Sequence, residues 1–444
     1  MSDAEPDQEP EPFQDADTQG DPEGESEPFT ELRTQTVADQ VSYAAMLDLE
    51  LTPDQEQLVK TVRDFCSREF APRIAADDRA VRHDPEIFAK LASIGLPGVC
   101  FPQRYGGHGL DYLSLGLVCE ELEYVDTVYR TVLSVHVGLV GCGIYTWGTE
   151  EQKQRWLAPM ARGEKLACFG LTEPNAGSDV ASMQATAKRS GGSYLLNGQK
   201  VWVSDADTAN FMLIFAKTDP KAGAHGVSAF MVDRAASGKA LRTEPIEDRL
   251  GIHAGDVGSI FMSDLEVDEA DRIGDEGDGF KVAMSCLDNG RYTIGAGATG
   301  TVRACLDASV KYAHERKTFG QEIGRYQLVQ QMIAHMSRDY EICKLLYYKV
   351  AWMKNNGLRH TREVSMCKQY AADAAFNAAN DAVEIHGAYG YSAEYPVERY
   401  LRNSRAPIIY EGTREVHTIL QAEYALGYRE DRLVKKSLPK YKPD

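Results

Sequence analysis

Residues 193–203 read SYLLNGQKVWV, and they decide the fold class because they interrupt a chain whose pattern is otherwise helical. Two short β-prone runs flank the pair Asn197-Gly198. An Asn-Gly pair between two such runs is the strongest short-range signal for a β-hairpin. The stretch therefore predicts a hairpin that turns at Asn197-Gly198, inside a β domain.

The rest of the chain is organised around this β region, which extends from about Lys165 to about Gly277. Further β-prone runs lie at 211–217, 226–232 and 258–265. Apolar residues recur with helical spacing on both sides of it. Helices are predicted before it from Leu51 to about Pro72 and at 85–94, 113–125 and 129–147. Longer helices are predicted after it, at about 281–315, 326–355, 362–386 and 413–427. Helices, then strands, then helices indicate an α+β fold in segregated blocks.

The N-terminal segment differs in composition from everything that follows. Residues 1–40 hold thirteen acidic residues and one basic residue, Arg33, with almost nothing to bury. Such a segment does not offset the entropy cost of ordering. The predicted segments are a disordered acidic tail (1–42), an N-terminal helical domain (43–165), a β domain (166–278), a C-terminal helical bundle (279–432) and a C-terminal tail (433–444).

The overall composition narrows the class of protein. The chain has 444 residues, 43% apolar content and a net charge of −19. An acidic balance argues against nucleic acids and anionic membranes as partners, and no run of 18 apolar residues predicts a membrane span. The N-terminus lacks the features of a signal or transit peptide, so a cytoplasmic enzyme is expected. Nine cysteines without a CxxC favour reduced core thiols over a disulfide framework or a zinc site.

A GxGxxG pattern at Gly295–Gly300 has the form of a dinucleotide-binding fingerprint, but its context is wrong. The fingerprint works at a strand-to-helix turn with an acidic residue about twenty positions later. Here the pattern lies within a predicted helix between Leu287 and Tyr312, and position 320 is glycine. The small residues are therefore predicted to let another helix approach closely.

The segment Ala406–Val416, APIIYEGTREV, is predicted to carry a catalytic base at a helix entrance. Gly412 allows a tight turn, and Thr413 can cap a helix that continues to Tyr424. The apolar run before Glu411 would raise the pKa of its carboxyl by burial, whereas the nearby helix N-terminus would lower it. The alternative is an ordinary solvated glutamate in a loop.

A second candidate site is the segment Ala167–Asp179, ACFGLTEPNAGSD. An apolar strand runs here into a loop with hydroxyls and free backbone donors, which suit the polar edge of a heteroaromatic ring or a phosphate. Taken alone, the segment is equally an ordinary polar turn. Four more motifs follow in order along the chain: WVS at 202–204, RKTFG at 316–320, HGAYG at 386–390 and YEGT at 410–413.

Together these motifs resemble the acyl-CoA dehydrogenase family, over nearly everything from about Leu51 to Gly427. The resemblance implies a helical N-terminal domain, a small antiparallel β domain and a C-terminal four-helix bundle. It also implies FAD bound between the β domain and the bundle, usually in a homotetramer. The implied flavin contacts are Phe169, Thr172, Ser178, Trp202 and Ser204. The segment implied to reach the FAD of a neighbouring subunit contains Arg316, Thr318 and Phe319. Further implied cofactor positions are Glu384, Gly387, Thr413 and Glu415.

Two positions depart from the family pattern. Ala388 replaces the second glycine of the usual Gly-Gly pair, and Glu384 stands where many relatives have a glutamine that faces the FAD. An added carboxylate near a pyrophosphate weakens binding unless it is turned away or paired.

The resemblance also implies the catalytic and substrate-binding residues. Glu411 matches the catalytic base of most members. Members that place the base elsewhere have a glutamate at the position of Gly290, which has no side chain to serve here. The implied contacts to the thioester and its CoA arm are Ser178, Asp288, Arg291, Tyr410 and Gly412.

Within the family, the pattern is nearest to glutaryl-CoA dehydrogenases. The residues that carry this likeness are Glu123, Arg130, Ser134 and Tyr410. In that subfamily the matching arginine and serine bind the distal carboxylate of the acyl chain. Arg130 and Ser134 are four residues apart on a predicted helix and share a face, and a guanidinium is a good bidentate ligand for a carboxylate. The alternative is a structural salt bridge of Arg130 with Asp126 or Glu123.

The implied function is FAD-dependent dehydrogenation of an acyl-CoA to its 2,3-enoyl-CoA, with electrons leaving to an electron-transfer flavoprotein. The substrate is either a dicarboxylyl-CoA such as glutaryl-CoA or a short- or medium-chain monocarboxylyl-CoA. Thr131 and Ser204 stand where decarboxylating members typically have serine and threonine, so decarboxylation stays open. Two more hypotheses are an acyl-CoA oxidase, which passes electrons directly to oxygen, and a flavin-binding homologue without dehydrogenase activity.

Overall fold

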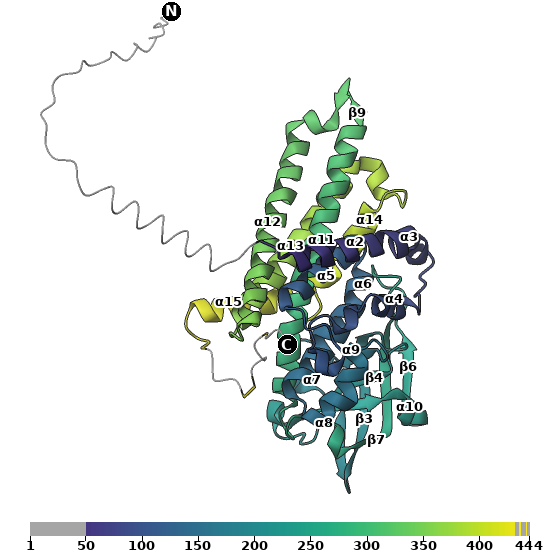
Figure 1. The fold of residues 1–444 in the computed structure, drawn as a ribbon, viewed down its shortest axis with the longest axis vertical. Coiled ribbons are helices and arrows are strands. Elements are labelled where there is room, and N and C mark those ends of the chain that lie inside the picture. The colour runs from purple at the N-terminus through teal and green to yellow at the C-terminus, as the bar shows by residue number, and fades with distance from the viewer. Residues whose placement is uncertain (1–49, 431–434, 437–440, 442–444) are drawn as a thin grey trace, which may run out of the picture. The chain divides into compact units, whose positions relative to one another are not determined.

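The structure is a computed structural model that describes residues 50–430, 435–436 and 441. The predicted acidic tail (1–42) lies outside these residues, as does most of the predicted C-terminal tail (433–444). The described chain is α+β in three successive blocks, as predicted: helices, a sheet, and longer helices (Figure 1).

The first block is helical. Its longer helices are α2 (Pro53–Glu69), α3 (Ala71–Arg79), α4 (Ile87–Ser93), α5 (Tyr112–Val125), α6 (Thr127–Leu133) and α7 (Cys142–Trp147). A π-helical segment, η3 (Ser134–Gly141), joins α6 to α7, and the shorter helices α8 (Glu150–Gln152) and α9 (Ala158–Ala161) end the block. Thr52 caps α2, because its side chain accepts from the Gln55 amide in a capping box.

The continuous run Thr127–Trp147 is long and apolar enough to cross a membrane by length and composition. However, 94% of its most apolar window is buried inside the fold, and it contains the buried side chains of Arg130 and His136. The run is therefore the central helix of the first block, packed between the other helices and the sheet.

The second block is one sheet of eight strands. They are β1 (Ala167–Gly170), β2 (Thr186–Ser190), β3 (Ser193–Ser204), β4 (Phe211–Lys217), β5 (Val227–Asp233), β6 (Leu241–Pro245), β7 (Val257–Asp268) and β8 (Arg272–Ile273). The order is β6-β7-β3-β2-β4-β5-β8, and β1 pairs with β4. The sheet is mostly antiparallel, as expected, but β1 runs parallel to β4, and one residue pair joins β2 and β4 in parallel.

The prediction of a hairpin turn at Asn197-Gly198 is wrong, because β3 runs through this pair without turning. The register against β7 shifts between Leu196 and Gly198, as at a β-bulge. The Asn197 side chain exchanges hydrogen bonds of 2.9 Å with Asp264 on β7, and a Cβ at position 198 would lie 2.8 Å from Ala185. The true hairpin turn is Gly191-Gly192, between β2 and β3.

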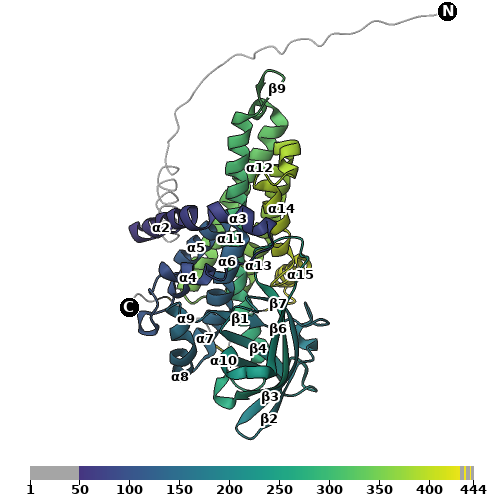
Figure 2. The ribbon, with the colours of Figure 1, turned by 90° about the vertical axis from the view of Figure 1, so that its right-hand side faces the viewer.

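The third block contains three long helices and two shorter ones. They are α11 (Gly279–Glu315), α12 (Gln327–Asn355), α13 (Thr361–His386), α14 (Val397–Ser404) and α15 (Arg414–Ala425). The sequence predicted all of these but α14 to within a few residues. A two-stranded hairpin, β9 (Lys317–Thr318) and β10 (Gln321–Glu322), joins α11 to α12 at the end far from the sheet (Figures 1 and 2).

The GxGxxG pattern lies within α11, as predicted, and its glycines give neighbouring helices room. A Cβ at Gly295 would lie 2.5 Å from the Cys367 sulfur on α13, and a Cβ at Gly300 would collide with a backbone carbonyl of α5. A Cβ at Gly297 would collide with the Glu123 carboxylate. The pattern therefore serves helix packing.

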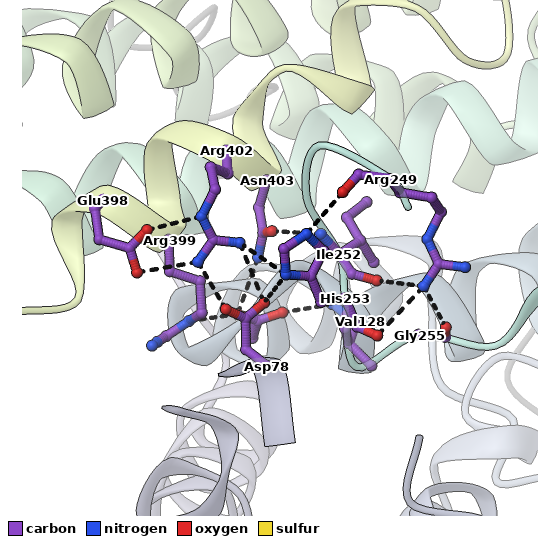
Figure 3. Close-up of polar contacts among 11 residues, drawn as sticks. Asp78, Val128, Arg249, Ile252, His253, Gly255, Glu398, Arg399, Arg402 and Asn403 are labelled. Atoms are coloured by element: carbon purple, nitrogen blue, oxygen red, sulfur yellow. Dashed lines mark hydrogen bonds and ion pairs between the residues drawn. The ribbon is translucent and has the colours of Figure 1, made fainter. Parts of the chain in front are cut away.

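A polar network joins the three blocks near α14 (Figure 3). The Arg402 guanidinium pairs with Asp78 of α3 at 2.6 Å, and Asn403 accepts from the Ile252 amide in the loop between β6 and β7. Arg399 and Asn403 both donate to the buried carboxylate of Asp126, between α5 and α6. Since α14 leads through the short helix η11 (Ala406–Ile408) into the Tyr410–Gly412 segment, this network anchors the chain just before that segment.

Candidate active site

The predicted base lies on a strained turn between α14 and α15. Glu411 has φ +53°, a left-handed conformation that is uncommon for a residue with a side chain, and Gly412 follows with φ +106°. Thr413 caps α15 as predicted, accepting from the Val416 amide at 3.4 Å. Non-glycine residues in this region cluster at functional sites, where the surrounding structure holds them in place.

The Glu411 carboxyl is enclosed. Its Oε2 atom is buried and has no hydrogen-bond partner among the described residues. It lies directly over Gly290 of α11, where a Cβ would collide with Oε2 and come within 2.6 Å of Leu139. Gly290 therefore makes the space that the carboxyl occupies.

Burial raises the pKa of Glu411 to about 7, and the nearby charges of Arg130, Arg291 and Lys368 oppose this rise. The sequence predicted the effect of burial. It attributed the opposing effect to a helix N-terminus, whereas the structure places three cations around the carboxyl. A general base works best when its pKa lies near the working pH, so this environment suits proton abstraction.

Two of these cations hold the backbone of the turn. Arg291 donates from Nε to the Glu411 carbonyl at 2.9 Å and from Nη1 to Asp288 at 3.1 Å. Lys368 of α13 donates to the Gly412 carbonyl at 2.6 Å. Arg291 and Asp288 were predicted to contact the substrate, which stays a prediction. In the structure Arg291 holds the Glu411 carbonyl, and Asp288 pairs with Arg291. The sequence did not point to Lys368, because nothing in its local pattern relates it to a loop 44 residues later.

Arg130 reaches the same turn from the other side. Its Nη2 donates to the Tyr410 hydroxyl at 2.5 Å, and its Nε donates to the Glu123 carboxylate at 2.5 Å. Both charged side chains are buried. The predicted structural ion pair thus forms with Glu123, while Asp126 pairs with Arg399 instead. Arg130 nevertheless remains next to Tyr410 and therefore next to the base.

Ser134 is tied to α11 rather than to Arg130. Its hydroxyl lies 2.5 Å from the Thr293 hydroxyl, and Thr293 donates to the Gly290 carbonyl at 2.8 Å. Since the Thr293 proton goes to this carbonyl, Ser134 is the donor of the shorter bond. Ser134 is thus left with acceptor capacity only, so its hydroxyl must rotate before it donates to a carboxylate.

Most of the predicted flavin residues converge where the loop after β1 meets the end of β3. Phe169 lies in β1, one residue before its end, and the Thr172 carbonyl in the following loop accepts from the Val201 amide of β3 at 2.9 Å. This bond brings Thr172 beside Trp202 and Ser204 at the end of β3. Trp202 is 61% exposed and has φ +58°. The buried ion pair of Lys200 and Glu173, at 2.7 Å, supports the loop from beneath.

The remaining predicted cofactor residues are dispersed. Ser178 is exposed on the loop after β1, and Glu384 and Gly387 are exposed at the C-terminal end of α13. Glu415 is exposed in the first turn of α15. The residues predicted to reach the FAD of a neighbouring subunit are Arg316, Thr318 and Phe319. They lie at the β9–β10 hairpin, far from the base turn (Figure 1). At the tip of this hairpin, Phe319 is 97% exposed.

The end of β3 fits a flavin. The indole of Trp202, held in a left-handed backbone with most of its surface exposed, offers a flat apolar face. Thr172, joined to β3 by the backbone bond, and Ser204 are half-buried and bring hydroxyl groups to the same end of the strand. The exposed guanidinium of Arg316 suits a pyrophosphate. The donor set therefore agrees with FAD, with the aromatic and hydroxyl groups in the β domain and the cationic group on the hairpin.

Comparison with known families agrees with this site. The acyl-CoA dehydrogenase N-terminal domain model matches residues 52–164, the middle-domain model matches 168–265, and the C-terminal-domain model matches 277–426. The chain belongs to the acyl-CoA dehydrogenase family. Members are FAD-dependent oxidoreductases that act on CH–CH bonds, and the chain is accordingly an FAD enzyme of this class.

The matches to individual relatives extend over nearly the whole length of each relative. The short-chain-specific acyl-CoA dehydrogenase of Clostridium acetobutylicum is 37% identical, over 84% of this chain and 98% of the relative. The glutaryl-CoA dehydrogenase of Desulfococcus multivorans is 36% identical, over 86% of this chain and 99% of the relative. A glutaryl-CoA dehydrogenase solved with glutaryl-CoA superimposes with a TM-score of 0.82 at 35% identity, over 88% of this chain and 99% of that structure.

Proposed function

We propose that this acyl-CoA dehydrogenase acts on a dicarboxylyl-CoA thioester such as glutaryl-CoA, with Glu411 as the base. The observation that carries the proposal is the placement of Arg130, whose guanidinium contacts Tyr410, the residue next to the base. Relatives of nearly equal similarity act on short acyl chains or on glutaryl-CoA, so the substrate is argued from the site itself.

The proton step belongs to Glu411. Its buried Oε2, without a hydrogen-bond partner among the described residues, is free to accept the α-proton of the thioester. A pKa near 7 leaves the carboxylate ionised over much of the neutral range and still basic. Loss of the α-proton and of a hydride from Cβ gives the 2,3-enoyl thioester.

The acidity of the α-proton depends on a donor to the thioester carbonyl. The Glu411 amide donates to no acceptor among the described residues, while its own carbonyl is held by Arg291. By family resemblance, the thioester carbonyl would be polarised by this N–H and, when FAD is bound, by a ribose hydroxyl of the cofactor. A fixed backbone donor stabilises the negative charge that develops on the oxygen at no cost in reorganisation.

The cofactor would be held at the end of β3. When bound, FAD supplies the acceptor for the β-hydride. Thr172, Trp202 and Ser204 would hold its ring system, and Arg316 with Phe319 would contact the FAD of a neighbouring subunit in a homotetramer. Exposure of Phe319 within one chain supports this assembly.

The distal end of the acyl chain is where the substrate class is decided. Arg130 is buried and uses Nε for Glu123 and Nη2 for Tyr410. Because Tyr410 accepts from Arg130, the phenol keeps its own proton for a carboxylate oxygen. Rotation of Ser134 adds a second donor. A carboxylate at this point gains donors that a methyl group leaves unused.

One observation favours a monocarboxylyl-CoA instead. Glu123 already neutralises Arg130, and a buried ion pair needs no third charge. The short- or medium-chain monocarboxylyl-CoA dehydrogenase is therefore the second candidate.

Electrons are proposed to leave to an electron-transfer flavoprotein, which is named by one similar structure. Oxygen consumption during turnover would indicate an acyl-CoA oxidase instead. A cytoplasmic setting is proposed as well, because all nine cysteines are free and buried, as in a reducing compartment.

A panel of CoA esters tests the substrate class. Initial rates with an artificial electron acceptor would be measured for glutaryl-CoA, butyryl-CoA and hexanoyl-CoA under the same conditions. We expect kcat/KM for glutaryl-CoA to exceed both others by at least about tenfold, since a site built around hydrogen-bond donors rejects a ligand that lacks the acceptor. A higher kcat/KM for butyryl-CoA would select the monocarboxylyl alternative.

A further inference from the structure

Lys368 is a buried lysine for which fold stability gives no reason. It is 1% exposed on α13. In the described part of the chain its ammonium forms no ion pair, and Asp373, one of the carboxylates that favour its charged form, pairs with Arg414. Its hydrogen bond goes to the Gly412 carbonyl at 2.6 Å. A neutral donor such as glutamine would satisfy a carbonyl without the cost of burying a charge.

The charge of Lys368 faces the base. The charges around the Glu411 carboxyl are those of Arg130 from α6, Arg291 from α11 and Lys368 from α13. Arg130 already has Glu123 as its partner, and Arg291 has Asp288. Of these three cations, only Lys368 has no carboxylate partner at ion-pair distance among the described residues.

Other titratable groups also face Lys368. Glu411, Asp373 and Glu415 favour its charged form, while burial and Arg291 oppose it. His417 of α15 accompanies it: its Nδ1 lies 2.8 Å from the Ser365 hydroxyl, one helical turn before Lys368. Burial and the charges of Lys368 and Arg291 lower the pKa of His417 to about 3, so this imidazole is neutral near the base turn.

We propose that Lys368 is a positioning residue of the dehydrogenation: its ammonium holds the Gly412 carbonyl and favours the ionised form of Glu411. The inference rests on the proposed role of Glu411 as the base. The strained Glu411-Gly412 backbone then depends on two cationic donors, one for each carbonyl. Arg291 supplies the first and Lys368 the second.

Burial lowers the pKa of the Lys368 ammonium to about 7, so it and the Glu411 carboxyl titrate over the same range. Two interacting groups of this kind lose protons in steps that belong to the pair. Removing the ammonium should therefore raise the pKa of the carboxyl by about one unit, the low end of the usual effect of an opposite charge.

Three substitutions separate the charge of Lys368 from its hydrogen bond. Lys368→Met removes both, Lys368→Gln keeps a donor without the charge, and Lys368→Arg keeps both. The control is Lys354→Met, which removes an equally buried lysine from α12 that does not contribute to the pKa of Glu411. The Glu411 carboxyl would be titrated directly by its protonated-carboxyl infrared band, which is identified by its loss in Glu411→Gln.

The expected result is a rise of about one unit in the pKa of the Glu411 band in Lys368→Met and Lys368→Gln. The same rise should appear in the pH profile of substrate-driven flavin reduction, so that activity falls about tenfold at pH 6 and recovers in part at pH 9. Lys368→Arg should restore the wild-type profile, and Lys354→Met should keep it.

An unchanged carboxyl titration in a folded Lys368→Met protein would overturn the proposal, as would a loss of activity that is equal at all pH values. Glu411→Gln tests the underlying function separately. If that variant still reduces its flavin with substrate, the base assignment fails. If it is inactive while the Lys368 variants titrate like wild type, only the role of Lys368 fails.

Discussion

Two turns in this chain share an unusual backbone and differ in everything around it. In the base turn, Glu411 and Gly412 have φ of +53° and +106°; at the tip of the β9–β10 hairpin, Phe319 and Gly320 have φ of +50° and +83°. The first turn is held by Arg291 and Lys368 through its carbonyls. At the second, Phe319 is 97% exposed.

The difference shows how the chain supports local strain. A left-handed non-glycine residue costs of order 1 kcal/mol and persists where other contacts hold it. At Glu411 those contacts come from α11 and α13 of the same chain. Phe319 has the positive φ of a two-residue hairpin turn, a position that asparagine or glycine fills at lower cost. We infer that its compensating contacts come from another subunit.

Substitution of Gly290 should have the largest effect, because it removes the space that the base occupies. A Cβ there would collide with Glu411 Oε2 and Leu139. Gly290→Ala is expected to lower kcat for acyl-CoA oxidation by at least about 10²-fold, the usual contribution of a general base. The control is Gly192→Ala, where a Cβ meets nothing within 4 Å. Rates that remain within a few-fold of wild type in both proteins would show that the base does not need its present position.

Arg130→Met should have the next largest effect on activity, and a selective one. An unpaired carboxylate in a buried site costs a few kcal/mol, so kcat/KM for glutaryl-CoA should fall by about 10²-fold or more. The rate with hexanoyl-CoA should be maintained or rise. Equal losses for both substrates, accompanied by a lower melting temperature, would assign Arg130 to the structural ion pair with Glu123 alone.

Glu411 should reduce stability at alkaline pH. Its pKa in the fold is about 7, above its ordinary value of 4.5, so the fold favours the neutral carboxyl. Stability from this group is fully present below about pH 4.5 and is lost as the pH rises through 7. Glu411→Gln should therefore be more stable than wild type at pH 8.5 by about 1–3 kcal/mol, and similar at pH 5. Urea unfolding at the two pH values measures this, and a less stable variant at pH 8.5 would contradict it.

The hairpin tip should give the smallest effect on the fold of one chain. Phe319→Asn introduces a residue that tolerates positive φ better than phenylalanine and removes the exposed ring. Its effect on unfolding free energy should stay within about 0.5 kcal/mol, as for other exposed positions. FAD retention and subunit association, followed by flavin content and sedimentation, should weaken. Unchanged association and flavin content would remove the tip from the cofactor site.

The sequence predicted the features that depend on neighbouring residues in the chain, namely helix caps and the helical or β character of each segment. Thr413 caps α15, Glu411 precedes it, and the three blocks follow from hydrophobic spacing. It failed where a local signal had another use. Asn197-Gly198 makes a bulge instead of a turn, because Asn197 bonds to Asp264 on β7 and Gly198 lies against Ala185.

The local sequence pattern also did not predict contacts between residues that are far apart in the chain. The i,i+4 pairing of Arg130 with Asp126 does not form because Asp126 ends α5 and caps α6, and its carboxylate binds the Val128 amide and Arg399. Arg130 then pairs with Glu123, across the break between the two helices. Lys368 reaches Gly412 only because α13 packs against the start of α15, a relation that periodicity within one helix does not encode.

Reduction of bound flavin by substrate in Glu411→Gln tests the central claim most directly. The variant keeps the shape and hydrogen-bonding capacity of the side chain but has no proton acceptor. Mixed anaerobically with glutaryl-CoA or butyryl-CoA, it should retain FAD while the rate of flavin bleaching falls at least about 10²-fold. A rate within a few-fold of wild type with either ester would contradict Glu411 as the base.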